Sequence, residues 1–206
     1  MLAFDHAIVL TTDVDATAAW LLEEHGLATA PGGRHEGHGT ANVIVPLGPD
    51  YLELMYVADP DEARSSPIGR WALEHASDEP SVAALMLRVP AVLPYALRLD
   101  LEIAEVQRTR SDGVELAWRL AGLESAFSDD PRPVFVECLM APEHHPGRDD
   151  APHRVQPRGI AWAEWGMEAS ALGRWLGQHD LDVRPNPALA GPGRIGVATE
   201  GGVVNL

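Results

Sequence analysis

This chain of 206 residues has a single cysteine and few basic residues for its number of acidic ones. Its single cysteine, Cys138, excludes a disulfide within the chain. Only 15 Lys and Arg residues stand against 31 Asp and Glu residues, which gives a formal net charge of −16. Such a chain repels nucleic acid and anionic lipid, so we expect no nucleic-acid partner and no membrane partner. No apolar run approaches the roughly 20 residues that cross a bilayer.

The N-terminus also lacks the pattern of a signal peptide, because the chain opens on a strand-like segment, Met1 to Phe4. Together with the single cysteine, this predicts a cytoplasmic protein. Cys138 has no recognisable catalytic context, and we interpret it as a buried, inert thiol. A hydrophobic content of 46% suffices for one substantial core or two small ones.

The strongest local pattern is in residues 40–57, which are typical of two strands joined by a turn at Gly48-Pro49-Asp50. Side chains alternate between the two faces of a strand, so Leu52 and Leu54 share the face that we expect to pack on helices. Glu53 then lies on the other face. A carboxylate there is costly unless it is paired, protonated or bound to a metal, and the alternative is that this face meets water.

The first helix is predicted from Val14 to His25. Thr12 and Asp15 have the spacing of a capping box, and Gly26 supplies the left-handed residue that ends many helices. A strand before this helix, a glycine-rich loop over residues 32–39 and the hairpin after it complete a first module in residues 1–58.

A second module with the same order is predicted in residues 81–140, after a connector over residues 59–80 that contains a short helix around Ile68 to His75. Its strands are expected at 102–110 and 114–120, around a Ser111-Asp112-Gly113 turn, and at 133–139. Glu137 in the last strand sits among apolar residues, much as Glu53 does.

A third, partial strand–helix–strand–strand module is predicted in residues 158–206. Residues 194–206 align without a gap to residues 42–54, which places Asn205 opposite Glu53. A repeat of this kind indicates a duplicated unit of secondary structure and favours an α+β fold.

Repeated modules with a His in the first strand and a Glu in the last resemble the vicinal oxygen chelate superfamily, and within it the glyoxalase-like domain group. The resemblance covers about residues 2 to 140. The segments that carry it are Phe4-Asp5-His6, Gly33 to Asn42, Tyr51-Leu52-Glu53-Leu54, Arg108 to Leu120 and Pro133 to Glu137.

The resemblance implies βαβββ modules whose curled mixed sheets enclose a cavity, with metal ligands from the first and last strands of each module. It places His6, Glu53 and Glu137 at a divalent metal such as Zn²⁺, Mn²⁺, Ni²⁺ or Fe²⁺. A fourth ligand is missing, because the position that matches His6 in module two is Ala83. Two carboxylates and one imidazole can bind a metal with water, but a metal-free relative would retain the same set.

Other histidines are weaker candidates for that vacancy. His144, His145 and His153 lie in a segment with the composition of an exposed turn, so we interpret them as solvated. His35 and His38 are close in sequence, but glycines interrupt the helical spacing that would align two ligands.

Four residues are predicted to contact the substrate in the cavity. Arg108 and Arg110 share a strand face on which two guanidinium groups could clamp a carboxylate or phosphate, although exposure or pairing with surplus acids would also explain them. Asn42 and Trp118 complete this set.

Two functions compete at this stage. In the first, a metal polarises neighbouring oxygens of a small substrate, and Glu53 or Glu137 acts as general base in an isomerase or lyase. A dioxygenase is disfavoured, because the ligands depart from the pattern of two His and one carboxylate. In the second, a metal-free cavity sequesters a small molecule, as resistance proteins of the superfamily do.

A homodimer is also expected. The third module lacks a partner module, so its sheet edge and the apolar face around Ile160 and Trp162 would need to be covered.

Overall fold

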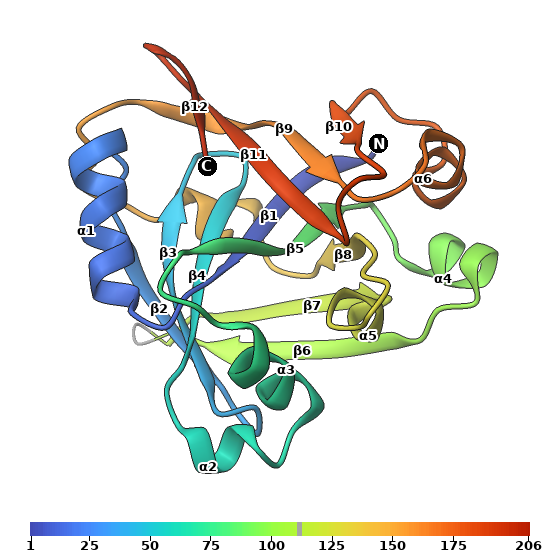
Figure 1. Cartoon of the computed structure of the whole chain (residues 1–206), viewed down its shortest axis with the longest axis horizontal. Helices are drawn as coiled ribbons and strands as arrows, with labels where there is room; N and C mark the ends of the chain where they lie inside the picture. The colour runs from blue at the N-terminus through green and yellow to red at the C-terminus, as the bar shows by residue number, and fades with distance from the viewer. Residues whose placement is uncertain (111–112) are drawn as a thin grey trace.

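The structure is a computed structural model that describes residues 1–110 and 113–206. Residues 111 and 112, in the expected turn before Gly113, lie outside the described part. The chain contains both helices and strands (Figure 1). In order they are β1 (Ala3–Leu10), α1 (Val14–His25), β2 (Ala30–His35), β3 (Thr40–Pro46), β4 (Tyr51–Val57), α2 (Pro60–Ala63), α3 (Pro67–His75), β5 (Ser81–Arg88), α4 (Leu93–Leu99), β6 (Ile103–Thr109), β7 (Glu115–Ala121), α5 (Leu123–Ala126), β8 (Val134–Cys138), the 3-10 turns η1 (Pro142–His144) and η2 (Pro146–Arg148), β9 (Pro157–Trp165), α6 (Ala169–Leu176), β10 (Val183–Pro185), β11 (Pro192–Thr199) and β12 (Gly202–Asn205). None of the helices in the described residues is long and apolar enough to cross a membrane.

Eight strands form one curled sheet in the order β2-β3-β4-β1-β5-β8-β7-β6. Each half has the same plan, because the first strand of a half pairs in parallel with its last strand: β1 with β4, and β5 with β8. The two halves meet where β1 and β5 pair antiparallel at the centre. This arrangement confirms the predicted α+β fold with paired modules around a curled sheet.

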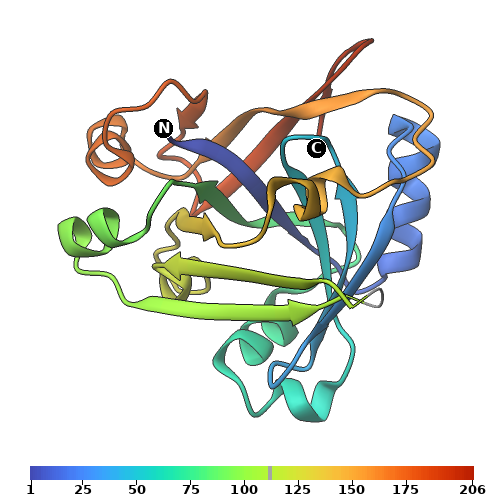
Figure 2. The ribbon, with the colours of Figure 1, turned by 180° about the vertical axis from the view of Figure 1, so that it is seen from behind.

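The sheet has an apolar core on each face. The outer face carries Leu52 and Leu54 and packs against α1 and α6, so the prediction for these two leucines is confirmed. The inner face carries Met55, Met86 and Trp118, together with side chains from α3 and α5. Seen from either side, the two halves of the sheet curl toward each other around the inner face (Figure 2).

The edge strands β2 and β6 end the strand order, so in the described residues no ladder joins them. Side chains bridge this seam instead. A Cβ on Gly33 of β2 would lie 2.9 Å from Cδ of Arg108 on β6, so glycine lets the arginine lie against the backbone. The Arg108 Nη1 atom is also 3.5 Å from Oδ1 of Asn42.

The C-terminal unit forms a second sheet in the order β10-β9-β11-β12. A third unit of strands and a helix is therefore present, but its strand order differs from that of the first two. β4 pairs in parallel with the first strand of its module, whereas β11 pairs antiparallel with β9 and β12 lies at an edge. The gapless alignment of residues 194–206 with 42–54 thus does not reflect equivalent positions in a sheet.

This second sheet lies across the outer face of the large sheet (Figure 1). Ile160 and Trp162 are buried within the chain, and Ile160 belongs to the outer core. The reason given for a homodimer, an uncovered face around these residues, is therefore removed, and the dimer itself stays a prediction.

Two local details differ from the sequence-based expectations. The cap of α1 is Asp13 rather than Thr12, since the Asp13 side chain accepts from the Ala16 N–H, while Gly26 does end the helix with φ 70°. The expected loop over residues 32–39 begins as strand β2, whose glycines fit the close approach to β3: a Cβ on Gly32 would lie 2.1 Å from the Asn42 carbonyl oxygen. The short helix in the connector is confirmed as α3.

Candidate functional site

A pocket of about 700 Å³ opens on the inner face of the curled sheet and is lined by both halves. Such a volume lies within the range of small-molecule sites. The first half contributes three histidines and two glutamates, which are His6, His35, His38, Glu36 and Glu53. The second half contributes Arg108 and Trp118 among apolar side chains. The pocket therefore has one wall with ligands for a metal or a proton and another with hydrogen-bond donors.

His6 and Glu53 meet in this pocket, as predicted. The His6 Nε2 atom is 3.8 Å from a Glu53 carboxylate oxygen, and both residues are buried. The His6 ring also stacks on Tyr51 with ring centroids 4.4 Å apart. Burial raises the pKa of the Tyr51 phenol well above its ordinary value, so this ring stays neutral and fixes the plane of the imidazole.

Asp5 fixes the other side of the His6 ring. The pairing of β1 with β5 shifts register between Phe4 and His6, which lets the neighbouring residues Asp5 and His6 contact each other although strand alternation would separate them. The Asp5 carboxylate lies 2.7 Å from His6 Nδ1. Burial acts to raise the pKa of Asp5, but hydrogen bonds from His145 and His6 outweigh burial and lower it below the ordinary value. Asp5 is thus an anion that accepts the Nδ1 proton.

His35 reaches the same glutamate from strand β2. Its Nε2 atom is 3.4 Å from the second Glu53 oxygen and 3.1 Å from Nδ2 of Asn42, while its Nδ1 atom contacts the Thr40 hydroxyl at 2.9 Å. The Asn42 amide is oriented by its oxygen, which accepts from the Gly33 N–H at 2.8 Å. The amide therefore donates to His35, which makes Nε2 of His35 an acceptor.

These contacts leave an unbalanced centre. His6 donates from Nδ1 to Asp5, which leaves its Nε2 atom facing the Glu53 carboxylate at 3.8 Å. His35 Nε2 accepts from Asn42 and lies 3.4 Å from the other Glu53 oxygen. Lone pairs and an anion repel each other in a buried pocket. A divalent cation or a shared proton would satisfy all three groups.

The donor types are those that a divalent transition metal takes, but in the described structure the ligand atoms of His6, His35 and Glu53 do not all lie within 4.8 Å of one another. Two imidazoles and one carboxylate suit Zn²⁺, Mn²⁺, Ni²⁺ or Fe²⁺, and an imidazole held from behind by a carboxylate, as His6 is by Asp5, is the usual arrangement of a metal-binding histidine. The set includes His35, which the sequence pattern had not favoured as a ligand. The three residues also form the pattern of two His and one carboxylate. The sequence-based ligand set lacked this pattern, which is why a dioxygenase was disfavoured there.

In the described lining, the second half contributes one carboxylate, Glu105 of β6, and no ligand at the positions that match His6 and Glu53. Ala83 is the position that matches His6 by sequence register, and Met86 and Val136 line this side of the pocket. Arg108 and Trp118 line it as predicted. Arg108 Nε and Trp118 Nε1 are buried, and neither has a hydrogen-bond partner among the described residues.

Glu137 does not join the site, contrary to the prediction. In β8 the side chain of Val136 faces the pocket, so the next residue points to the other face of the sheet. One Glu137 oxygen accepts from the Val92 N–H at 3.1 Å, and the other lies 3.8 Å from Arg119. Its carboxylate is explained by these partners on the outer side.

Arg110 also lies outside the pocket lining. Its guanidinium donates to Asp149 at 2.7 Å, near the turn η2. Only Arg108 of the two predicted arginines therefore lines the pocket. Arg110 follows the end of β6, and its side chain binds the Asp149 carboxylate of the linker instead.

Two of the three linker histidines, His145 and His153, are not the solvated residues that we expected. His145 is buried, accepts at Nδ1 from the Gly147 N–H and places Nε2 3.2 Å from Asp5. His153 accepts from the Ala28 N–H at 3.0 Å. Neither fills the vacancy in the pocket. His145 instead holds Asp5, a role without a sequence signal, since it depends on the fold of η2 against β1.

Cys138 completes the surroundings of Asp5. Its thiol donates to the Asp5 carboxylate at 3.3 Å, and burial raises the pKa of the thiol, which agrees with the interpretation of an inert group. One group of three potential metal ligands in the described residues has its ligand atoms within 4.8 Å of one another. It consists of Asp5, Cys138 and His145. The Nε2 proton of His145 and the nearby Arg88 guanidinium, 3.6 Å from Asp5, make this group a hydrogen-bond cluster around an anion.

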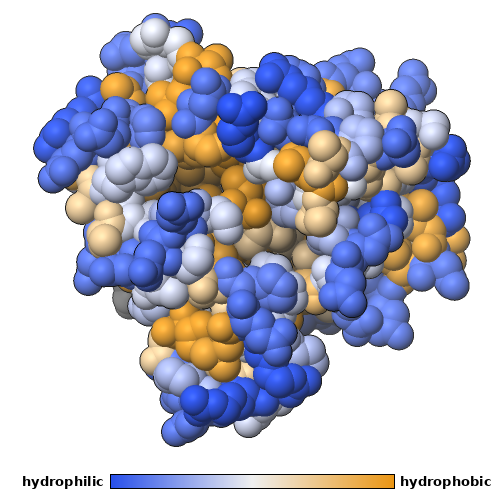
Figure 3. Space-filling view, viewed as in Figure 1, coloured by the Kyte–Doolittle hydropathy of each residue, from blue (hydrophilic) through white to orange (hydrophobic). Residues whose placement is uncertain are grey.

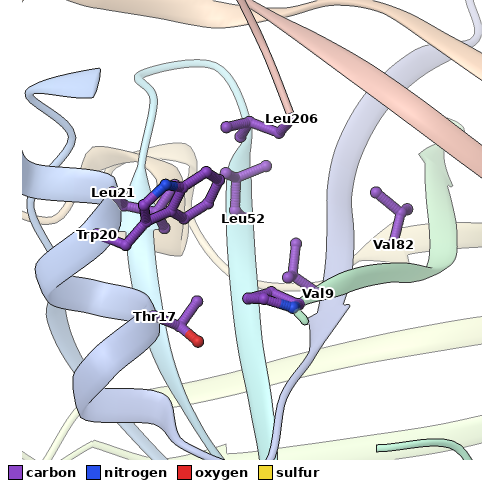
Figure 4. Close-up of a pocket in the computed structure, with 8 residues that line it drawn as sticks. Val9, Thr17, Trp20, Leu21, Leu52, Val82 and Leu206 are labelled. Atoms are coloured by element: carbon purple, nitrogen blue, oxygen red, sulfur yellow. The ribbon is translucent and has the colours of Figure 1, made fainter. Parts of the chain in front are cut away.

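A second, much smaller hollow lies on the outer side. In the space-filling view a hydrophobic hollow opens between α1 and β11 (Figure 3). Its volume is about 40 Å³, and its lining is almost entirely apolar, with Trp20 and Leu21 of α1 facing Leu52 and the C-terminal Leu206 (Figure 4). This hollow is a packing gap, because it has room for a few waters at most and offers them few polar partners.

Comparison with known proteins places this architecture. A family described as a glyoxalase-like domain matches residues 4–177. No curated protein matches the sequence. A hypothetical protein from Staphylococcus aureus superposes with a TM-score of 0.63 at 13% identity, over 100% of this chain and 84% of that one.

Two methylmalonyl-CoA epimerases are more distant in structure. A variant of the Streptomyces coelicolor enzyme, in complex with 2-nitronate-propionyl-CoA, has a TM-score of 0.49 at 16% identity, over 68% of this chain and 100% of that one. The Mycobacterium tuberculosis enzyme has a TM-score of 0.48 at 16% identity, over 68% of this chain and 89% of that one. The family match over most of the chain, with paired modules around one pocket, shows that the chain belongs to the glyoxalase-like domain family of the vicinal oxygen chelate superfamily.

Proposed function

We propose that this protein is a metal-dependent enzyme of the isomerase or lyase type that acts on a small molecule with neighbouring oxygens. The observation that carries the proposal is the convergence of two imidazole Nε2 atoms on Glu53, at 3.8 Å for His6 and 3.4 Å for His35. These three residues would hold the metal. A divalent metal bound there would act as a Lewis acid on two oxygens of the substrate.

Glu53 would be the proton acceptor of the reaction. It is the carboxylate that faces both imidazoles in a largely buried site, so a proton taken from the substrate stays within reach of His6 or His35. The predicted pair of catalytic carboxylates is replaced by one carboxylate and its imidazole neighbours, because Glu137 lies on the other face of the sheet.

Asp5 would act as a positioning residue. Its carboxylate keeps the Nδ1 proton on His6, which leaves the Nε2 lone pair free for a ligand. His145 and Cys138 in turn hold Asp5. This arrangement supports a His6 ring with one tautomer and one orientation before any substrate binds.

A second candidate function is the sequestration of a small molecule without a metal. The apolar wall of the second half, with Met86, Trp118 and Val136 in place of a fourth ligand, supports it. Binding by this wall needs shape and hydrophobic contact rather than a Lewis acid.

Calorimetric titration of Zn²⁺, Mn²⁺, Ni²⁺ and Fe²⁺ into tag-free apo protein separates the two functions. We expect binding by the wild-type protein, and its loss in His6→Ala and Glu53→Gln. Glu137→Gln is the matched control, since it removes a carboxylate from the equivalent strand but from the other face, and should bind as wild type does. Affinity no better than about millimolar, about 4 kcal/mol, would leave the sequestering function.

The homodimer remains a prediction, and light scattering should give the mass of two chains. A mass of one chain at micromolar concentration would contradict it.

A further inference from the structure

The two unpartnered donors of the second half face the same pocket as the metal-ligand residues of the first. Arg108 Nε and Trp118 Nε1 are both buried without a hydrogen-bond partner among the described residues, and Trp118 is only 9% exposed. A buried donor without a partner costs about 1–3 kcal/mol, and a charged one costs more. Two such donors in one pocket indicate a ligand that supplies the acceptors.

From these donors we infer that the substrate is an organic carboxylate, whose carboxylate group is bound by Arg108 and Trp118 and whose apolar body lies on the inner face of the sheet. This inference rests on the proposed function in placing the substrate in this pocket, and it names the chemical class of that substrate. Arg108 supplies a positive charge, and the two N–H groups can each donate to one carboxylate oxygen.

The charges in the pocket favour a carboxylate over a phosphate as the bound group. Arg108 is the cation on the wall from the second half, and one of its three nitrogens, Nη1, already faces Asn42 Oδ1 at 3.5 Å. Glu36, Glu53 and Glu105 also line the pocket. Arg34 also lines the pocket, but it is already paired with Glu62 at 3.1 Å. Arg108 can therefore balance a singly charged group, whereas a phosphate monoester brings close to two negative charges.

The remaining lining supports an apolar body. Ile8, Met86, Leu120 and Val136 form the floor of the pocket, and Phe127 adds an aromatic side chain. Hydrogen-bond contacts also connect the two ends of the site, because Asn42 touches Arg108 through its oxygen and His35 through its nitrogen. Arg108 is thus joined to Glu53 through Asn42 and His35, so a ligand held at Arg108 would lie near Glu53.

The test compares three probes that share one apolar body: 3-phenylpropanoate, its neutral amide 3-phenylpropanamide, and 2-phenylethyl phosphate. Calorimetry on the protein as purified should give a preference of about tenfold or more for the carboxylate over the amide. Arg108→Gln should reduce this ratio to about threefold or less, and Trp118→Phe, which keeps an aromatic ring but removes the N–H, should lower it less.

Arg110→Gln is the matched control. It removes the same charge two residues further on, outside the pocket lining, and should leave the ratio unchanged. Circular dichroism and thermal melts must show that each variant is folded. Where Arg108→Gln does not fold, Trp118→Phe decides the question through the same ratio.

No binding of the carboxylate at millimolar concentration, an equal affinity for the amide, a preference for the phosphate, or an equal effect of Arg110→Gln would each overturn the inference. Glu53→Gln separates this test from the proposed function, since it should abolish metal binding and keep the carboxylate preference. If the metal titration fails while the preference persists, only the metal-dependent function falls. If the metal binds but no preference exists, only the carboxylate assignment falls.

Discussion

Asp50 provides the sharpest test of the packing between the curled sheet and the C-terminal unit. Its carboxylate is buried and accepts from a backbone N–H, that of Ile160, at 3.0 and 3.1 Å. Backbone packs closely against it: a Cβ on Gly159 would lie 2.9 Å from Oδ2 of Asp50. Burial raises the pKa of Asp50 from 3.8 to about 7, because one backbone donor does not replace the water that the anion loses.

The sign of the resulting pH dependence follows from the proton count. Between pH 4 and 7 the unfolded chain has lost the Asp50 proton while the folded chain keeps it, so stability falls as pH rises through this window. The rise of the Asp50 pKa from 3.8 to about 7, at about 1.4 kcal/mol for each tenfold change in proton affinity, amounts to about 4 kcal/mol. Below pH 4 this cost is absent, and above pH 7 it is complete.

Asp50→Asn removes the charge at every pH and keeps an oxygen for the Ile160 N–H. We therefore expect the free energy of unfolding of the variant, relative to wild type, to rise by about 4 kcal/mol between pH 4 and pH 8. Urea melts at several pH values measure this change, and any pH-independent cost of the amide cancels in the difference. Asp61→Asn is the control for the loss of one negative charge, because that side chain is 96% exposed. If the difference in free energy of unfolding between Asp50→Asn and wild type changes by less than about 1 kcal/mol between pH 4 and pH 8, the reasoning is refuted.

Two further predictions concern the cluster around Asp5. Asp5→Asn should weaken metal binding by about 10- to 100-fold, since His6 loses the anion that fixes its tautomer, and should lower the free energy of unfolding by about 3 kcal/mol, as calorimetry and urea melts would show. Unchanged metal affinity would contradict the positioning role. Cys138 should react slowly with a disulfide reagent at pH 8 in the folded protein and rapidly in urea, because burial raises its thiol pKa. Equal rates in both states would contradict this.

Predictions from the sequence succeeded where the two-residue alternation of side chains in a strand identifies the buried face. Alternation in residues 51–57 correctly separated Leu52 and Leu54 from Glu53, because an acid and two leucines reveal which face is which. The same reasoning failed in β8, where apolar residues surround Glu137 on both sides. Phe135 packs in the outer core and Val136 lines the pocket, so local hydrophobicity could not identify the inner face.

Contacts between distant segments account for the site residues that could not be predicted from the sequence. Asp5 contacts His6 only through a register shift in β1, which needs β5 as a partner. His35 enters the site because β2 pairs with β3, and Gly32 permits a close approach that its sequence context did not reveal. His145 is buried because a glycine two residues later packs on the backbone of Asp50. Each is a tertiary effect without a local signal.

The seam between β2 and β6 has a consequence for access to the pocket. Both edge strands contribute to the lining, and Arg108 lies across the gap on Gly33 with a contact of 3.5 Å to Asn42. A molecule that passes between these strands need displace only side chains, since no backbone ladder of the described residues has to open. Arg108 is thus the side chain that bridges the two edge strands and also, by our inference, a hydrogen-bond donor to the ligand. If Arg108 binds the carboxylate of the ligand, as we infer, the same side chain contacts both the ligand and the backbone of β2 across the seam.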